Sequence, residues 1–264
     1  MNWTQINNKR KKHVRYGERV FGRMFQIIRS QIADTLRQVD TVGEIESAMD
    51  GVVFDEDIDH AFDVFYRKVG VDFAKSTYKS MKGYDNRELK EDIAQLERMW
   101  ELYMAAFVAE KAGPKIESVR RTLLATYRRE IDRAVQEGLD QGWGVDKIGR
   151  EILKQGRRTE KWQAMRIART EVLSASNYGS AQGAEATGEP LVKEWLISPS
   201  PDQREDHLAM VGTTIDYAED FLLPSGESLF LPGDPGGALE EIINCRCGVS
   251  FKPKEDRISQ ILES

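Results

Sequence analysis

Apolar side chains recur every three or four residues through the first half of the chain, the spacing of one face of an α-helix. The pattern predicts helices over about 15–39, 57–81 and 86–111, and a fourth from Ile116 to Leu139. The predicted buried stripe of the first is Phe21, Met24, Phe25, Ile28, Ile32, Leu36 and Val39. Breakers such as Asp50-Gly51 and Gly113-Pro114 separate the helices. Four amphipathic helices with short connections are typical of a helical bundle.

A glycine-rich stretch follows the fourth helix and indicates a boundary near residue 140. Beyond it the apolar spacing predicts a short helix over about 145–154, a loop over 155–158 and a helix over about 159–185. Small residues recur along the last of these and predict close packing against a neighbour: Ala164, Ala168, Ala175 and Ala181.

From residue 188 proline and glycine become frequent and the apolar runs become short, which predicts short strands. The expected strands lie at 193–197, 213–215, 229–231 and 248–251. The fold class expected is therefore α+β, an all-helical N-terminal region followed by a small α+β domain with short strands. The expected division is a helical region at 1–140, a second domain at 141–255 and a tail at 256–264.

The 264 residues suggest one or two domains, and 40% hydrophobic with 31% charged residues is ordinary for a soluble protein. No apolar run reaches 18 residues, which argues against a membrane span, and the N-terminus lacks the apolar stretch of a secretion signal. Two cysteines separated by one residue exclude a disulfide framework and fit a reducing compartment.

The net charge of −6 hides a marked asymmetry along the chain. Residues 1–30 hold eight basic residues and one acidic residue, a net charge of +7, and residues 141–170 carry +5. Residues 171–264 carry a net charge of −11, so this segment is poorly suited to bind a phosphate backbone. The basic N-terminus is a candidate contact for nucleic acid, or for an acidic protein surface, or is a solvated tail. Its candidate residues are Lys9, Arg10, Lys11, Lys12 and Arg15.

The segment 244–247 reads Asn-Cys-Arg-Cys and brings two thiols near one point. Thiolates paired in this way suit a borderline cation such as zinc, and His207 would be a third ligand. Candidates for a fourth ligand are Asp202, Asp206 and Asp234. Two alternatives remain open: buried structural thiols beside a turn, and a Cys–His nucleophile.

Two further groups of polar residues have a catalytic and a structural interpretation. Arg204 and His207 would share a helical turn beginning near Pro201. In the catalytic interpretation His207 is a general base and Arg204 binds an anion. In the structural interpretation both side chains form hydrogen bonds to strands or loops of their own domain. A second group falls within one predicted helix: Arg166, Arg169, Thr170 and Glu171. These residues could take part in catalysis. Alternatively they could form an internal polar lock, in which Glu171 accepts a hydrogen bond from Arg246 or Arg204.

The motifs of well-known enzyme classes are absent. The sequence contains neither G-x-x-x-x-G-K-[ST] nor G-x-G-x-x-G, and neither G-x-S-x-G nor H-E-x-x-H. The expectation is therefore a protein without catalytic residues.

The order and spacing of motifs over roughly 141–253 resemble the phage Mu F-like head morphogenesis family, the minor capsid proteins of tailed phages. The series runs Arg166-Ile-Ala-Arg-Thr-Glu171, Asn177, Lys193-Glu-Trp-Leu196, Arg204-x-x-His207, Gly212, Phe221, Pro232-Gly-Asp-Pro235 and Ile243-Asn-Cys-Arg-Cys247. Family members often carry Asp and Arg seven and five residues before the histidine, where this chain has Ser200 and Asp202. An acid–base set built on that pair would be incomplete here.

The resemblance implies a virion component inside the head near the portal vertex, present in the host cytoplasm during assembly. It implies the portal protein as partner and a role in head assembly, DNA packaging or DNA ejection. Further candidate partners are the major capsid or scaffold protein, and packaged double-stranded DNA through the basic N-terminus; no membrane is expected. No cofactor is expected apart from the candidate zinc. The alternative is a head-carried enzyme or zinc-dependent effector that acts after delivery. The expected structural motif is Arg166, Arg169, Thr170, Glu171, Arg204, His207, Asn244, Cys245, Arg246 and Cys247.

Overall fold

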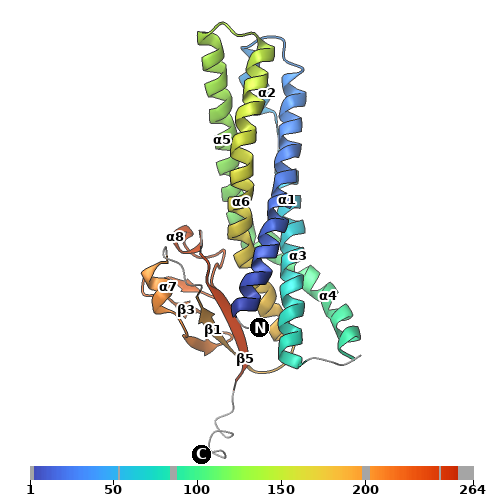
Figure 1. Cartoon of the computed structure of the whole chain (residues 1–264), viewed down its shortest axis with the longest axis vertical. Helices are drawn as coiled ribbons and strands as arrows, with labels where there is room; N and C mark the ends of the chain where they lie inside the picture. The colour runs from blue at the N-terminus through green and yellow to red at the C-terminus, as the bar shows by residue number, and fades with distance from the viewer. Residues whose placement is uncertain (1–2, 53, 84–87, 198–202, 244, 255–264) are drawn as a thin grey trace, which may run out of the picture. The chain divides into compact units, whose positions relative to one another are not determined.

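The computed structural model describes residues 3–52, 54–83, 88–197, 203–243 and 245–254. Its helices are α1 (Trp3–Leu36), α2 (Glu44–Asp50), α3 (Asp55–Lys82), α4 (Glu88–Phe107), the π-helix η1 (Val108–Ala112), α5 (Gly113–Asp140), α6 (Val145–Glu185), α7 (Glu205–Ala209) and α8 (Leu239–Ile242). Its strands are β1 (Leu191–Leu196), β2 (Thr214–Asp216), β3 (Phe221–Leu222), β4 (Ser228–Leu229) and β5 (Gly248–Pro253). The α+β class predicted from the sequence is confirmed (Figure 1). No helix in these ranges combines the length and apolarity that crossing a membrane requires.

The chain forms two compact units. The helical unit contains Val14–Phe65 and Gly113–Ala168. The mixed unit contains the described residues up to His13, Tyr66–Ala112, and those from Arg169 onward. The boundary expected near residue 140 does not coincide with the division into these two units. Helices α1, α3 and α6 each contribute residues to both units.

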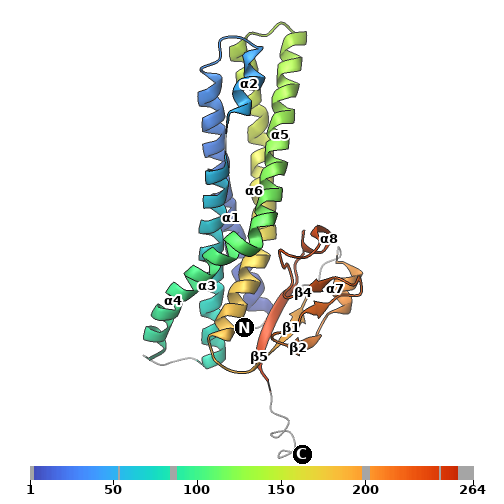
Figure 2. The same ribbon diagram turned by 180° about the vertical axis from the view of Figure 1, so that it is seen from behind.

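Long helices running side by side make up the helical unit, as Figures 1 and 2 show for α1, α5 and α6. Phe21 of α1 is fully buried, and its ring centroid lies 5.0 Å from that of Phe62 and 5.2 Å from that of Phe65. The predicted apolar stripe is buried from Phe21 to Leu36, whereas Val39 lies beyond the helix and is half-buried.

At the end of α5 the predicted stripe is wrong by one residue. Leu139 is 55% exposed, and Gly138 takes the buried position instead. A Cβ atom at residue 138 would lie 2.4 Å from Ile148 Cγ1, so α5 and α6 approach closely just before their connecting turn. Glycine is selected here for its lack of a side chain.

Helix α6 corrects a second expectation, because it runs unbroken through the predicted loop at 155–158. One interior glycine costs a helix only about 1 kcal/mol relative to alanine. The helical face also continues across it: Ile152, Glu160 and Ala164 are all buried, and Arg29 of α1 pairs with the Glu160 carboxylate. Packing on both sides of Gly156 therefore outweighs the local preference for a turn.

Strand β1 is the centre of the small sheet in the mixed unit, pairing antiparallel with β2 and β5. Trp195 of β1 is fully buried, and its ring meets that of Phe221 edge-on at 5.1 Å. The strands predicted at 193–197, 213–215 and 248–251 match β1, β2 and β5 in place, whereas the one predicted at 229–231 overlaps β4 at Leu229 alone. The remaining strand, β3, has two residues, too few for an alternating pattern to be visible in the sequence.

A close crossing of α3 and α6 provides the other packing feature of the mixed unit. A Cβ atom at Gly179 would lie 2.2 Å from the carbonyl oxygen of Gly70. One turn further along α6, a Cβ atom at Gly183 would lie 2.1 Å from the carbonyl oxygen of Ala74. At this crossing the close approach of α6 is made by glycines, whereas the predicted Ala168 packs closely against Gly17 of α1.

Candidate functional site

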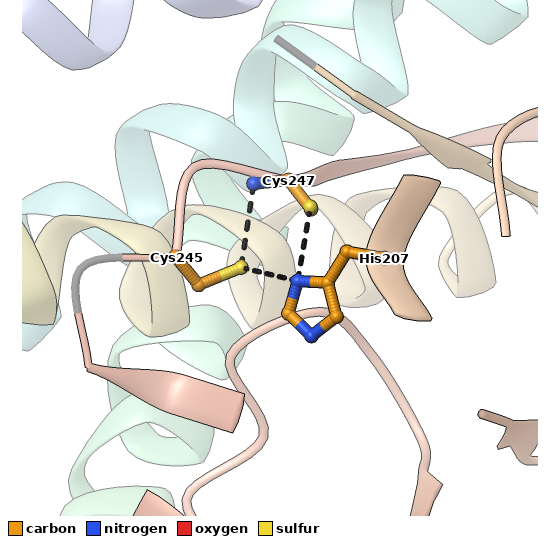
Figure 3. Close-up of side chains that lie close together, drawn as sticks. All are labelled: His207, Cys245 and Cys247. Carbon is orange, nitrogen blue, oxygen red and sulfur yellow. Dashed lines mark hydrogen bonds between the residues drawn. The ribbon is translucent and has the colours of Figure 1, made fainter. Parts of the chain in front are cut away.

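The turn that leads into β5 brings both cysteines to the histidine of α7 (Figure 3). The sulfurs of Cys245 and Cys247 each lie 3.5 Å from His207 Nδ1. The three donor atoms lie within 4.8 Å of one another, and all three residues are buried. The structure therefore assembles the three residues that the sequence nominated as metal ligands.

Two neighbours fix the orientation of the His207 ring. On one side, Nε2 lies 2.8 Å from a carboxylate oxygen of Glu241 in α8. Since a carboxylate can only accept, Nε2 carries a ring proton, and Nδ1 is the nitrogen that faces the two sulfurs. On the other side, the Trp195 ring packs edge-on with its centroid 5.4 Å away.

The electrostatics of the cluster are strongly asymmetric. A hydrogen bond from the Cys247 side chain holds the pKa of Cys245 well below its usual value. Burial raises the pKa of Cys245, but the interaction with His207 lowers it further. The same hydrogen bond, together with burial, raises the pKa of Cys247. Burial lowers the pKa of His207, but Cys245 and Glu241 raise it by more. Of the two thiols, Cys245 is the one that ionises first.

A buried arginine from the other end of the chain supports this turn. Arg10 of α1 donates from Nη1 to the carbonyl oxygen of Cys247 at 3.0 Å and from Nε to Ser176 Oγ at 2.7 Å. Its third hydrogen bond goes to the side-chain oxygen of Asn177. Burial lowers the pKa of Arg10 to about 10, although the nearby cysteine sulfurs raise it. Arg10 thus joins α1, α6 and the start of β5.

The polar face of α6 also holds the Pro-Gly-Asp-Pro loop at 232–235. Asn177 Nδ2 donates to the Pro232 carbonyl oxygen at 2.6 Å, and Ser174 Oγ donates to the Gly233 carbonyl oxygen at 2.6 Å. Asp234 accepts from the backbone N–H groups of residues 230 and 236. Its carboxylate serves this turn, so it is not a fourth ligand of the cysteine–histidine cluster.

The structure separates the other predicted site residues. Arg204 precedes α7 and donates to the Ile243 carbonyl oxygen at 2.7 Å, which ties α7 to the turn before the cysteines.

Glu171 accepts from Tyr66 Oη at 2.5 Å, a partner that the sequence did not suggest. Arg166, Arg169 and Arg246 are exposed, and Arg204 is engaged with the Ile243 carbonyl oxygen. Thr170 is buried. Asn244, Pro201 and Asp202 lie outside the described residues.

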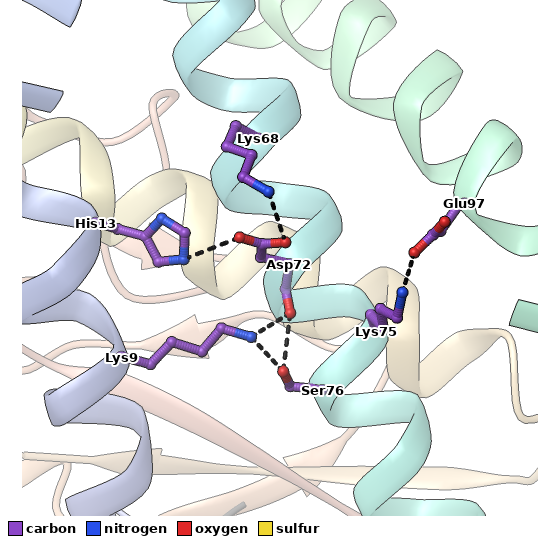
Figure 4. Close-up of polar contacts among 7 residues, drawn as sticks. All are labelled: Lys9, His13, Lys68, Asp72, Lys75, Ser76 and Glu97. Atoms are coloured by element: carbon purple, nitrogen blue, oxygen red, sulfur yellow. Dashed lines mark hydrogen bonds and ion pairs between the residues drawn. The ribbon is translucent and has the colours of Figure 1, made fainter. Parts of the chain in front are cut away.

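The basic N-terminal segment is helical, and two of its five candidate cations are engaged inside the mixed unit. Besides Arg10, Lys9 donates to the Asp72 carbonyl oxygen and to Ser76 Oγ (Figure 4). Lys11, Lys12 and Arg15 are exposed. The expectation of a free basic tail is therefore corrected: Arg10 has no exposed guanidinium to offer a phosphate or another protein.

His13 lies in the same polar group and gives the mixed unit a pH-dependent stability. It faces Asp72, with Nε2 3.4 Å from the carboxylate, and has Lys9, Lys68 and the Phe73 ring around it (Figure 4). Burial lowers the pKa of His13 to about 4, and Asp72 only partly opposes this.

We expect the free energy of unfolding to fall as the pH drops from about 6.5 to about 4. In that window unfolded His13 binds a proton that the folded protein does not, so stability is lost on acidification, by up to about 3 kcal/mol in full. Urea unfolding across this range, compared with His13→Gln, measures the effect. Parallel pH profiles for the two proteins would contradict it.

An open basic groove lies between α1 and α6 of the helical unit, with a volume of about 930 Å³. Its charged and aromatic lining residues are Arg15, Glu18, Arg19, Arg29, Arg157, Glu160, Lys161 and Trp162. The Trp162 side chain is 54% exposed, and the guanidinium of Arg166 lies 5.3 Å from its ring centroid. The two segments in which the sequence concentrates positive charge meet along this groove.

Comparison with known proteins gives one positive result. A family model described as Phage Mu protein F like protein matches residues 129–250. Neither curated proteins nor solved structures give a significant match. The matched segment runs from late α5 through α6 into β5 and contains the cysteine–histidine cluster. The resemblance inferred from the motifs over 141–253 is thereby confirmed: residues 129–250 of this chain are similar to the phage Mu F-like family.

Proposed function

We propose that this protein is a minor head protein of a tailed phage, bound to the portal inside the head. There it assists head assembly, DNA packaging or DNA ejection. The observation that supports the proposal is the family match over residues 129–250, because the family is one of phage head morphogenesis. The protein is present in the host cytoplasm during assembly and in the virion afterwards.

The proposed role is not enzymatic. The side chains with the strongest chemistry, His207 and the two cysteines, are 2%, 6% and 0% exposed. A substrate must come within hydrogen-bonding distance of a catalytic base or nucleophile, and burial to this extent prevents it. The burial disfavours the alternative of a head-carried effector that uses these residues.

The basic groove is the surface that we assign to the portal. It combines several arginines with an exposed tryptophan, the two residue types most enriched among the dominant contacts of protein interfaces. Glu18 interrupts the positive charge and the buried Glu160 neutralises Arg29, which suits a partner surface of mixed, mainly acidic character better than a uniform phosphate backbone. An acidic face of the portal protein would complement it.

Co-sedimentation of the full chain with the portal protein of the same phage tests the proposal. The chain should bind at a fixed ratio, and Arg15→Glu with Lys161→Glu should weaken binding at least tenfold, because both side chains are exposed and line the groove. The matched control is Arg121→Glu with Arg133→Glu, which makes the same charge change on exposed positions of α5. Truncation at residue 140 is not a useful test, because it divides both units.

Three results would count against portal docking through the groove. One is the absence of binding by the full chain. Another is equal weakening by the two charge-reversed pairs, which would indicate a nonspecific charge effect. The third is binding of double-stranded DNA through Arg15 and Lys161 that falls steeply with salt, without portal binding, which would favour a DNA-packaging accessory.

A further inference from the structure

The ring nitrogen that faces the two cysteines lies at the same distance from both of them. His207 Nδ1 is 3.5 Å from each sulfur, and Nε2 of the same ring is turned towards Glu241. A cation placed between Nδ1 and the two sulfurs would contact all three atoms at once.

The two nitrogen–sulfur distances in the cluster match those of a zinc site. With zinc–sulfur bonds of about 2.3 Å, zinc–nitrogen bonds of about 2.05 Å and a tetrahedral angle, a ligating nitrogen and sulfur are about 3.6 Å apart. The observed separations are both 3.5 Å, and the three donor atoms lie within 4.8 Å of one another.

The surroundings of the cluster have the features that accompany metal ligands. Ligating histidines almost always donate their second ring N–H to a carboxylate, carbonyl or water, and Glu241 provides that acceptor at 2.8 Å. The backbone N–H of Cys247 points at the Cys245 sulfur, 3.5 Å away. The indole Nε1 of Trp195 is buried and interacts with the Cys247 sulfur, which becomes a stronger acceptor when ionised.

We propose that His207, Cys245 and Cys247 bind one zinc ion and that Glu241 positions the histidine. Two thiolates and an imidazole in a compact, buried site favour zinc over hard cations such as calcium or magnesium. The role proposed is structural. The ion would join α7 to the turn before β5, and both α7 and α8 are too short to be stable helices on their own.

Metal analysis of the full-length protein, purified without chelators from zinc-supplemented cells, should find about one zinc per chain. Cobalt(II) added to the metal-free protein should give intense visible bands and a near-ultraviolet sulfur-to-metal band, and zinc should displace both. Removal of the metal should lower the melting temperature, and zinc should restore it. These readouts use the wild-type chain, so they do not depend on a variant that folds.

Substitutions then assign the ligands and the positioning residue. Cys245→Ser, Cys247→Ser and His207→Asn should each abolish the near-ultraviolet band or reduce zinc to well below one per chain. Glu241→Gln should weaken zinc binding about 10–100-fold, while Glu240→Gln, exposed on the same short helix, should not change it. Asp206→Asn is a second matched control, because Asp206 adjoins His207 but does not belong to the cluster.

A folded wild-type protein with neither zinc nor a cobalt spectrum would overturn the proposal. If Cys245 in that metal-free protein were also alkylated rapidly at neutral pH, the pair would be a thiolate–imidazolium nucleophile instead. Equal zinc affinity in Glu241→Gln and wild type would overturn the positioning role of Glu241.

Discussion

Replacing Arg10 with methionine is expected to lower the free energy of unfolding by at least about 3 kcal/mol. The guanidinium is buried, and its removal leaves Ser176 Oγ, Asn177 Oδ1 and the Cys247 carbonyl oxygen without their donor. Each buried group that loses its partner costs about 1–3 kcal/mol. Methionine extends as far as the Nε position of arginine and so fills the channel of the aliphatic stem, which leaves the guanidinium and its hydrogen bonds as the part removed in the urea-unfolding measurement.

Two further variants make the Arg10 experiment specific. Lys11→Met removes a positive charge from the next position of the same helix, where the side chain is exposed, and should change stability by no more than about 0.5 kcal/mol. Arg10→Lys keeps the charge but cannot supply three donors in a planar fork, so it should recover only a minor part of the loss. Equal stability of Arg10→Met and Lys11→Met would show that the three contacts contribute nothing.

The role of Arg10 also shows where sequence-based prediction failed. Within the run Lys9–Lys12 all four side chains are basic, and composition alone indicated one solvated or nucleic-acid-binding segment. Helical spacing carries the missing signal: Ile6, Arg10 and Gly17 continue the buried stripe of α1 towards the N-terminus. The helix was expected to begin near residue 15, so this stripe was not followed back far enough.

The cysteine–histidine cluster illustrates the opposite case. The two thiols of a C-x-C pair lie close together in the sequence and can bind the same ion as a third ligand from elsewhere in the chain. Residue types alone were therefore enough to identify His207 as a candidate ligand. The orienting carboxylate was not predictable. Glu241 lies four residues before Cys245 in a helix of only four residues, and only the fold brings it to the far side of the imidazole ring. A residue that orients a metal ligand, such as Glu241, can be identified only from the tertiary structure, whereas the ligands themselves can be recognised from their residue types.

Glutamate 171 shows a similar limit. Its position in a helix and its acidic type predicted a buried polar contact, and such a contact exists. One partner is Tyr66, which lies 105 residues away in α3 and which the sequence did not suggest. A tyrosine on an apolar face gives no sign in the sequence that its hydroxyl is directed at a carboxylate.

The second large effect is expected where α3 crosses α6. Gly179→Ala places a methyl group 2.2 Å from the carbonyl oxygen of Gly70 and 2.6 Å from its Cα atom. Both obstacles are backbone atoms and cannot turn aside, so the two helices must separate along their contact. We expect a loss of at least about 3 kcal/mol in the free energy of unfolding, at the upper end of the range for overpacking. Gly183→Ala should behave alike, because its methyl group would lie 2.1 Å from the carbonyl oxygen of Ala74.

Gly22 of α1 is the matched control, since a Cβ atom there meets nothing within 4 Å. Alanine has the higher helix propensity, so Gly22→Ala should raise stability by up to about 1 kcal/mol, opposite in sign to the substitutions at 179 and 183. Chemical denaturation of the three variants under the same conditions measures the difference. If Gly179→Ala were as stable as Gly22→Ala, the α3–α6 backbones could not approach as closely as the structure places them. The glycines of α6 would then be incidental, and the packing of the mixed unit would depend on its apolar side chains alone.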